Sequence, residues 1–131
     1  MKEIVEKAVN EYYSNDVEIA LMVTIPKKIK WEDYLKEINA VKDGTQEMNF
    51  KVSSKPTKVS VGDKCFLCHD GYVKGWMRIS SISKKAFQCT TTGKQWDEAW
   101  YVGRSGEFHP IEGFQQKGFM GYKYVNANDY L

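Results

Sequence analysis

The alternation of apolar and polar positions divides the chain into a helical first part and a strand-rich remainder. Residues 2–14 place their apolar side chains on one helical face, which predicts an amphipathic helix over residues 1–16. Residues 30–41 repeat this spacing, and Gly44 follows where the end of a helix favours a positive φ. Between them, Val17–Ile25 is rich in β-branched and apolar residues and predicts a buried strand.

From residue 48 onward the pattern is that of short strands joined by turns. The predicted strands cover residues 48–52, 64–69, 72–82, 86–91, 98–103 and 118–125. Turn signals between them include Asp70-Gly71, Thr92-Gly93 and Ser105-Gly106. Because closure removes exposed sheet edges, this spacing favours a closed or nearly closed β-barrel. We therefore predict one α+β domain over residues 1–131, with a barrel and one inserted helix over residues 17–125.

Composition supports a globular protein. The 131 residues are 42% apolar and 27% charged, which suits one domain with its own core. The first residues alternate charged and apolar side chains, and no stretch approaches the roughly 20 apolar residues that span a bilayer. With an odd count of three cysteines, the sequence predicts a reduced, cytoplasmic protein without a membrane partner.

Charge and aromatic residues are unevenly distributed. The net charge is only +2, but residues 51–94 carry nine Lys or Arg against two Asp. Aromatic residues make up 14% of the chain and gather after residue 66. A basic, aromatic segment of this kind is typical of two arrangements, a solvated face over a packed core or a surface that stacks bases and binds phosphates.

Three pieces of the chain, taken in order, resemble the PUA-like superfamily and its ASCH branch. These are the strand Ala20–Pro26 before the second helix, the Gly-Asp turn in Val61–Phe66, and the aromatic strand Lys117–Tyr124. Each piece is common in barrels, so the resemblance depends on their order and spacing. It implies a small PUA-like β-barrel with flanking helices.

The ASCH branch has a G-x-K-x-x-E-x-R pattern after that helix, and the same spacing here falls on Gly44, Gln46, Asn49 and Lys51. Hydrolytic members, which cleave acylated cytidine, use a lysine and a carboxylate in this region. Gln and Asn cannot exchange a proton near neutral pH, so we expect a protein without catalysis. Amides do pair with base edges, although Gln46 and Asn49 equally suit a role in supporting the turn.

The resemblance and the basic, aromatic segment together predict one cleft that binds RNA, single-stranded DNA or a modified nucleotide. Its predicted residues are Gln46, Asn49, Lys51, Lys74, Trp76, Arg78, Trp96, Trp100 and Arg104. Tryptophans are expected to stack on bases and cations to meet phosphates, unless the tryptophans pack in the core. Two alternatives stay open. One is a divergent amidohydrolase acting on an acylated nucleoside through Glu47 or His69, and the other is a protein-interaction module using the N-terminal helix.

One motif suggests a metal or cofactor. Cys65–His69 matches C-x-x-C-H, the string that attaches haem, and Cys89 and His109 add further possible zinc ligands. Side chains three apart on a strand point to opposite faces, and Cys89 has no ligand beside it in the sequence. We therefore expect buried, packing cysteines, with neither cofactor nor metal.

Overall fold

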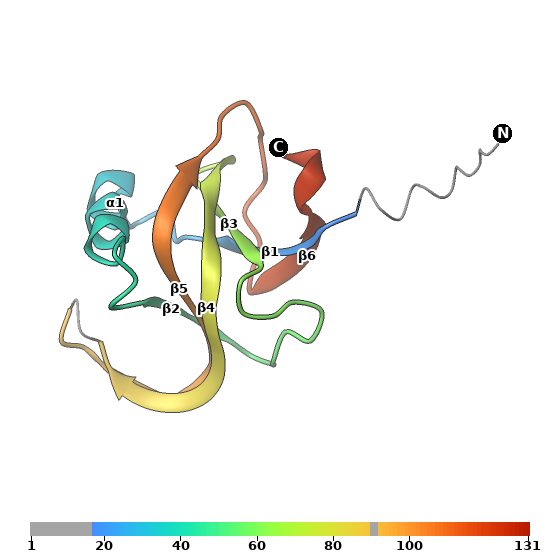
Figure 1. Cartoon of the computed structure of the whole chain (residues 1–131). Helices are drawn as coiled ribbons and strands as arrows, with labels where there is room; N and C mark the ends of the chain where they lie inside the picture. Colours follow the sequence, from blue (N-terminus) through green and yellow to red (C-terminus); the bar gives the residue numbers. More distant parts are fainter. Residues whose placement is uncertain (1–16, 90–91) are drawn as a thin grey trace, which may run out of the picture.

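The computed structural model describes residues 17–89 and 92–131 (Figure 1). Its elements are β1 (Ile19–Thr24), α1 (Trp31–Ala40), β2 (Met48–Val52), β3 (Lys64–His69), β4 (Tyr72–Gln88), β5 (Gln95–Pro110), β6 (Tyr122–Asn126) and the short 3₁₀ helix η2 (Ala127–Asp129). The predicted helix over residues 1–16, and the protein contact suggested for it, lie outside the described residues. Within the described part, no helix is long and apolar enough to cross a membrane.

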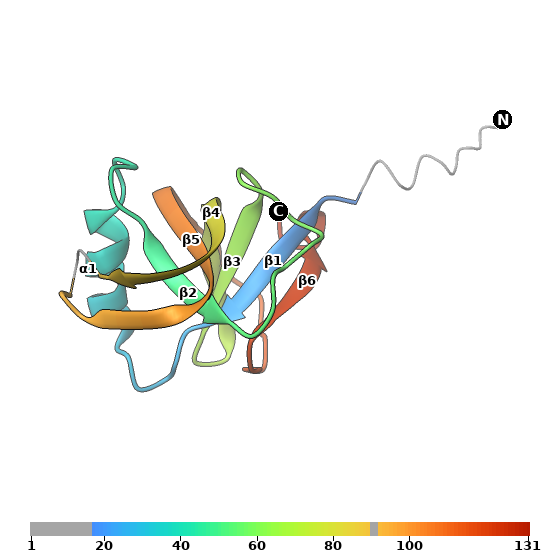
Figure 2. The same ribbon diagram turned by 90° about the horizontal axis from the view of Figure 1, so that it is seen from below.

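The six strands form one sheet in the order β2-β5-β4-β3-β1-β6. Figure 2 shows this sheet curving into a half-barrel with α1 beside it, which makes a small α+β fold. β1 and β3 are parallel, and the crossover between them contains α1 and β2. Both strands are buried over nearly their whole length, as parallel strands covered on two faces usually are.

β2 and β6 stand at opposite ends of the strand order and are the two edges of the sheet. Side chains of β6 contact the loop that follows β2. In the loop after β2, the backbone N–H of Thr57 donates to Tyr124 Oη at 2.9 Å. Ser54 Oγ also lies 3.4 Å from Tyr122 Oη. The prediction was a closed or nearly closed barrel. The sheet is a half-barrel whose two edges are bridged by hydroxyl contacts and not by a strand ladder.

Two apolar clusters cover the two faces of the sheet. One lies under α1 and contains Ile38 with Leu21 and Cys65. The other contains Phe66 and Cys68 and packs against the segment from Ile111 to Tyr130. Cys65 and Cys68 thus lie on opposite faces, as the sequence predicted, and cannot share one metal ion.

The last strands differ from the prediction in length. Residues 72–82 and 86–91 were expected as separate strands, but residues 72–88 form the single strand β4. Ser105-Gly106 is not a turn, because it lies inside β5. Register shifts between Trp76 and Arg78, and at two further places in this pair, accommodate residues that otherwise signal a break.

β4 and β5 extend beyond the sheet as a two-stranded ribbon. β3 pairs with β4 only as far as Arg78, and β2 pairs with β5 only from Trp100 to Arg104. Residues 85–89 and 92–99, here called the arm, therefore have no strand partners except each other in the ladders of the described chain. Figure 2 shows the arm running across β2 toward α1.

Candidate functional site

A pocket of about 440 Å³ lies where the arm approaches β2 and α1, and we call it the arm pocket. It is lined by Ile25, Pro26, Ile29, Tyr34, Glu37, Met48, Asn49, Phe50, Lys51, Phe87, Cys89, Thr92, Lys94, Trp96 and Arg104. Four consecutive residues of β2 contribute to it, since β2 is an edge strand. A pocket of this size, mostly apolar with few polar groups, is typical of a small-molecule site.

Arg104 is the most unusual lining residue, because its side chain is charged and only 1% exposed. It lies within β5, opposite Met48 of β2 and Ile79 of β4. Its Nη1 donates to Tyr34 Oη at 2.9 Å. Its Nε is buried and has no hydrogen-bond partner among the described residues. A buried cation is costly unless it is paired, so the free Nε needs an explanation.

The titratable groups near Arg104 do not neutralise it. Burial alone lowers the pKa of Arg104, but Tyr34, Cys65 and Glu37 together raise it above its ordinary value. Burial raises the pKa of Tyr34 and raises the pKa of the Cys65 thiol to about 11, so both groups are neutral near pH 7. Burial also raises the pKa of Glu37, although the charge of Arg104 opposes this.

Two further buried polar atoms lack a hydrogen-bond partner in the described part of the chain. They are Asn49 Oδ1 and Trp96 Nε1. With Arg104 Nε they complete the set of such atoms there, and all three residues line the arm pocket. Native proteins leave few buried polar groups unpaired. Two donors and one acceptor without partners therefore belong to residues that line one hollow.

Aromatic packing holds Trp96 in place. Its ring stacks on Phe87, across the arm, with centroids 5.6 Å apart. Both rings meet the ring of Tyr101 edge to face, at 5.0 Å from Phe87 and 5.7 Å from Trp96. Tyr101 is fully buried, and its hydroxyl donates to the carbonyl oxygen of Asp97. The indole that faces the pocket is thus fixed from the core side.

A second polar cluster, the Glu47 cluster, lies beside the arm pocket. Glu47 accepts hydrogen bonds from Ser80 Oγ at 2.5 Å, Ser81 Oγ at 2.9 Å and Lys85 Nζ at 2.9 Å. A Cβ at Gly103 would collide with this carboxylate, so a glycine is required there. Burial raises the pKa of Glu47, but these hydrogen bonds outweigh it and the pKa is lowered overall.

The structure brings together four of the nine residues predicted for the site. Asn49, Lys51, Trp96 and Arg104 all line the arm pocket. Gln46 lies nearby, but lines a separate hollow of about 520 Å³ that also contains Glu47. Arg104 was expected to meet phosphates at an open cleft, whereas it is buried beneath Tyr34.

Two of the remaining predicted residues are close to aromatic or cationic partners outside the pocket. Lys74 Nζ lies 5.3 Å from the ring centroid of Trp31, at another hollow beside α1. Trp100 packs against the core and has Lys55 Nζ 5.4 Å from its ring centroid. Neither is available as a wall of the arm pocket.

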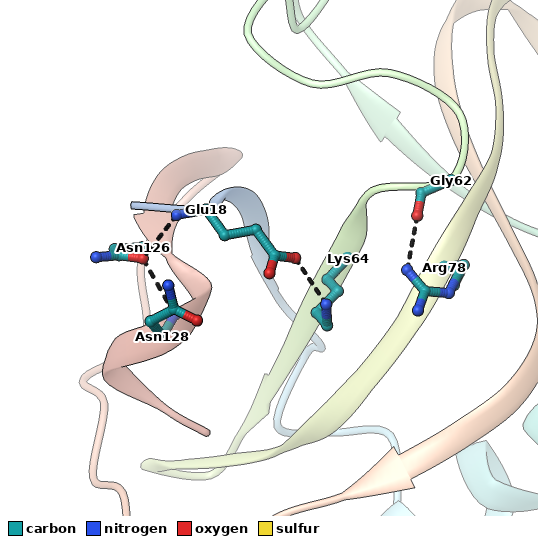
Figure 3. A network of polar contacts seen from close by, with 6 residues as sticks. All are labelled: Glu18, Gly62, Lys64, Arg78, Asn126 and Asn128. Carbon is teal, nitrogen blue, oxygen red and sulfur yellow. Dashed lines mark hydrogen bonds and ion pairs between the residues drawn. The ribbon is translucent and has the colours of Figure 1, made fainter. Parts of the chain in front are cut away.

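Trp76 and Arg78 lie in the β3–β4 region. Trp76 is 8% exposed and stacks on His109 with ring centroids 3.9 Å apart, which agrees with a packing role. Arg78 Nη1 donates to the carbonyl oxygen of Gly62 at 2.9 Å, and nearby Lys64 pairs with Glu18 at 2.6 Å (Figure 3). The basic segment is thus spread over several structural contacts.

Sequence reasoning did not select Tyr34, Glu37 or the arm residues Phe87 and Lys94. Tyr34 belongs to the apolar side of the helix predicted over residues 30–41, and Glu37 follows it by nearly one turn on the same side. The spacing of these two residues was the sequence signal that could have placed both of them at the same site. His69 was considered for catalysis, but its Nε2 lies 2.7 Å from the carbonyl oxygen of Ile29 and it does not line the arm pocket.

Fold and pocket together define a small α+β half-barrel with a mostly apolar, ligand-sized pocket where the arm approaches β2 and α1. Searches against family models, curated proteins and solved structures gave no match to this chain. The resemblance to the PUA-like superfamily accordingly stays a prediction from the sequence.

Proposed function

We propose that this chain is a non-catalytic binding module of PUA-like type that takes a nucleobase, free or as part of a nucleotide or nucleic acid, into the arm pocket. The observation that carries the proposal is that Asn49, Trp96 and Arg104, each with a buried polar atom that lacks a partner among the described residues, all line one mostly apolar hollow. A ligand that satisfies them offers at least two acceptors and one donor. Base edges carry such mixed sets.

The shape and chemistry of the walls agree with a planar ligand. Phe50, Phe87 and Trp96 line the pocket from different segments. Aromatic side chains stack on the faces of bases, and each such contact contributes roughly 1–3 kcal/mol to binding. A volume of about 440 Å³ leaves room for a base and part of its sugar.

Two lysines indicate where a phosphate belongs. Lys51 and Lys94 line the pocket while their side chains are exposed. Exposed cations at the mouth suit a hydrated phosphate, whereas an apolar interior suits the base. The base therefore enters the pocket and the phosphate stays at the surface. A free nucleotide can bind in this orientation, and so can an unstacked base in RNA or single-stranded DNA.

The amidohydrolase alternative receives no support from the residues suggested for it. Neither Glu47 nor His69 lines the arm pocket, and the hydrogen bonds to Glu47 lower its pKa, which makes it a weaker base. Incubation with acylated cytidines, followed by chromatography, is expected to return the substrate unchanged.

Tryptophan fluorescence titration tests the proposal. Nucleoside monophosphates and short RNA and DNA oligonucleotides are expected to bind the full chain at low salt. Asn49→Leu should weaken binding by about tenfold, because it removes one polar partner from a buried site. Lys51→Ala should reduce the slope of log K against log salt concentration by about one, which corresponds to the loss of one phosphate contact.

Arg78→Ala provides the matched control, since Arg78 carries a similar charge outside the pocket and bonds to Gly62. Its affinity should equal that of the wild type. Absence of binding by every nucleotide and oligonucleotide at low salt would reject the proposal, as would equal losses in Arg78→Ala and Asn49→Leu.

A further inference from the structure

Arg104 forms no ion pair with an acid of the described residues, although the charge of Glu37 acts on it. The guanidinium stays protonated at any pH at which the protein is folded. The ion pairs in the described part of the chain are Lys27–Asp70, Lys64–Glu18 and Lys85–Glu47, and none includes Arg104. At 1% exposure, water does not take the place of a counterion. The pocket therefore holds a buried positive charge.

The neighbours of Arg104 explain why the charge is left over. Tyr34 and Cys65 are neutral near pH 7, and they supply a hydroxyl and a thiol. Glu37 is an acid whose charge affects Arg104, but its side chain is partly exposed and forms no ion pair with Arg104 within the described residues. An anion on the ligand would complete the site.

We propose that the base bound in the arm pocket bears a carboxylate, and that this carboxylate pairs with the Nε edge of Arg104. The inference rests on the proposed function for the identity of the base. Nη1 donates to Tyr34, and Nε, which shares the other edge of the guanidinium with Nη2, has no partner among the described residues. The two N–H groups of that edge are parallel and match the two oxygens of a carboxylate.

Other ligand groups fit Arg104 less well. A neutral carbonyl would satisfy the Nε–H but leave the charge without a counterion. A phosphate is larger and more strongly hydrated, and the exposed Lys51 and Lys94 at the mouth already suit it. A planar carboxylate attached to an aromatic ring brings one negative charge into an otherwise apolar hollow and keeps the ligand flat between the aromatic walls.

Matched ligands separate charge from shape. Calorimetric titration of the full chain near pH 7 compares uracil-5-carboxylate with uracil-5-carboxamide, and cytosine-5-carboxylate with cytosine-5-carboxamide, with benzoate as an acid that lacks a base. In at least one pair the carboxylate should bind roughly tenfold or more tightly than its amide, because charge-assisted hydrogen bonds are about twice as strong as neutral ones.

Three variants assign that preference to Arg104. Arg104→Met should bind carboxylate and amide equally. Arg104→Lys keeps the charge without the planar fork, so it should retain only part of the preference, and it serves if Arg104→Met fails to fold. Glu37→Gln should tighten carboxylate binding more than amide binding, because it removes the neighbouring negative charge.

The outcomes distinguish this inference from the proposed function. Equal binding of carboxylate and amide overturns the carboxylate and leaves base binding in place. No binding by any of the four pyrimidines, with Arg104-dependent binding of benzoate, supports a carboxylate site at Arg104 and overturns the carboxylate-bearing base. No binding by any compound overturns the carboxylate, and the nucleotide titration described above decides base binding independently.

Discussion

The Glu47 cluster and the arm pocket lie beside the same edge strand, and Asn49 contributes to the hollows at both places. In the Glu47 cluster, a charged side chain receives three different donors from β4. In the arm pocket, Arg104 has one hydrogen bond from its side chain and a buried Nε without a partner in the described chain. The first charge is satisfied within the fold, and the second is not.

This difference separates a structural polar cluster from a binding site. A fold gains stability when buried polar groups are paired, whereas groups kept unpaired cost stability and are retained where a ligand uses them. The comparison therefore predicts that substitution in the Glu47 cluster affects folding and that substitution of Arg104 affects binding.

The largest expected effect is on the stability of a Glu47→Gln variant. Its free energy of unfolding should fall by about 2 kcal/mol, because the hydrogen bonds to a charged group are lost and Lys85 is left unpaired. Urea denaturation measures this change. Glu98→Gln, at an exposed position on the arm, is the matched control and should lie within about 0.5 kcal/mol of the wild type.

A smaller effect is expected for Arg104→Met. Its free energy of unfolding should stay within about 1 kcal/mol of the wild type, because removing an unpaired buried charge offsets the lost bond to Tyr34. The double variant Tyr34→Phe/Arg104→Met should be more stable than Arg104→Met alone, because it leaves no Tyr34 hydroxyl without a hydrogen-bond partner. A loss as large as that of Glu47→Gln would assign Arg104 to the structural framework and break the comparison.

The smallest effect concerns pH. The pKa of Glu47 is lowered by folding, so its carboxylate contributes stability above an unfolded pKa of about 4.3, and this is lost as pH falls through the folded pKa. The pKa of Glu37 is raised, so its ionisation costs stability as pH rises above about 4.3 through the folded pKa.

Urea denaturation between pH 3 and 7 therefore sharpens the comparison. The difference in free energy of unfolding between wild type and Glu47→Gln should become smaller as pH falls. The free energy of unfolding of Glu37→Gln, relative to that of the wild type, should increase as pH rises toward 7. Parallel pH profiles for the two variants would show that the two carboxyls do not have the opposed environments described above.

Much of the secondary structure was accessible from sequence patterns. The helix predicted over residues 30–41 is α1 (Trp31–Ala40), and the strands predicted at 48–52 and 64–69 are β2 and β3. Asp70 and Gly71 have φ values of 49° and 88°, as a tight hairpin turn requires. These features depend on side chains that are close in sequence, so local periodicity and turn chemistry determine them.

The sequence did not predict the arm or the open sheet. β-bulges let β4 and β5 continue through Ser105-Gly106, and only the pairing of the two strands reveals them. Closure of a sheet depends on the distance between β2 and β6, which hydroxyl contacts bridge here. Neither property is contained in a window of neighbouring residues.

For the site, residue types alone identify side chains with suitable chemistry, and Asn49, Lys51, Trp96 and Arg104 are among the nine candidates. Folding brings these four residues to one pocket, while Trp76 and Arg78 take part in contacts elsewhere. The physical reason is that desolvation depends on what covers a side chain. Arg104 differs from an ordinary surface arginine only because α1 lies over it and Tyr34 binds one end of its guanidinium.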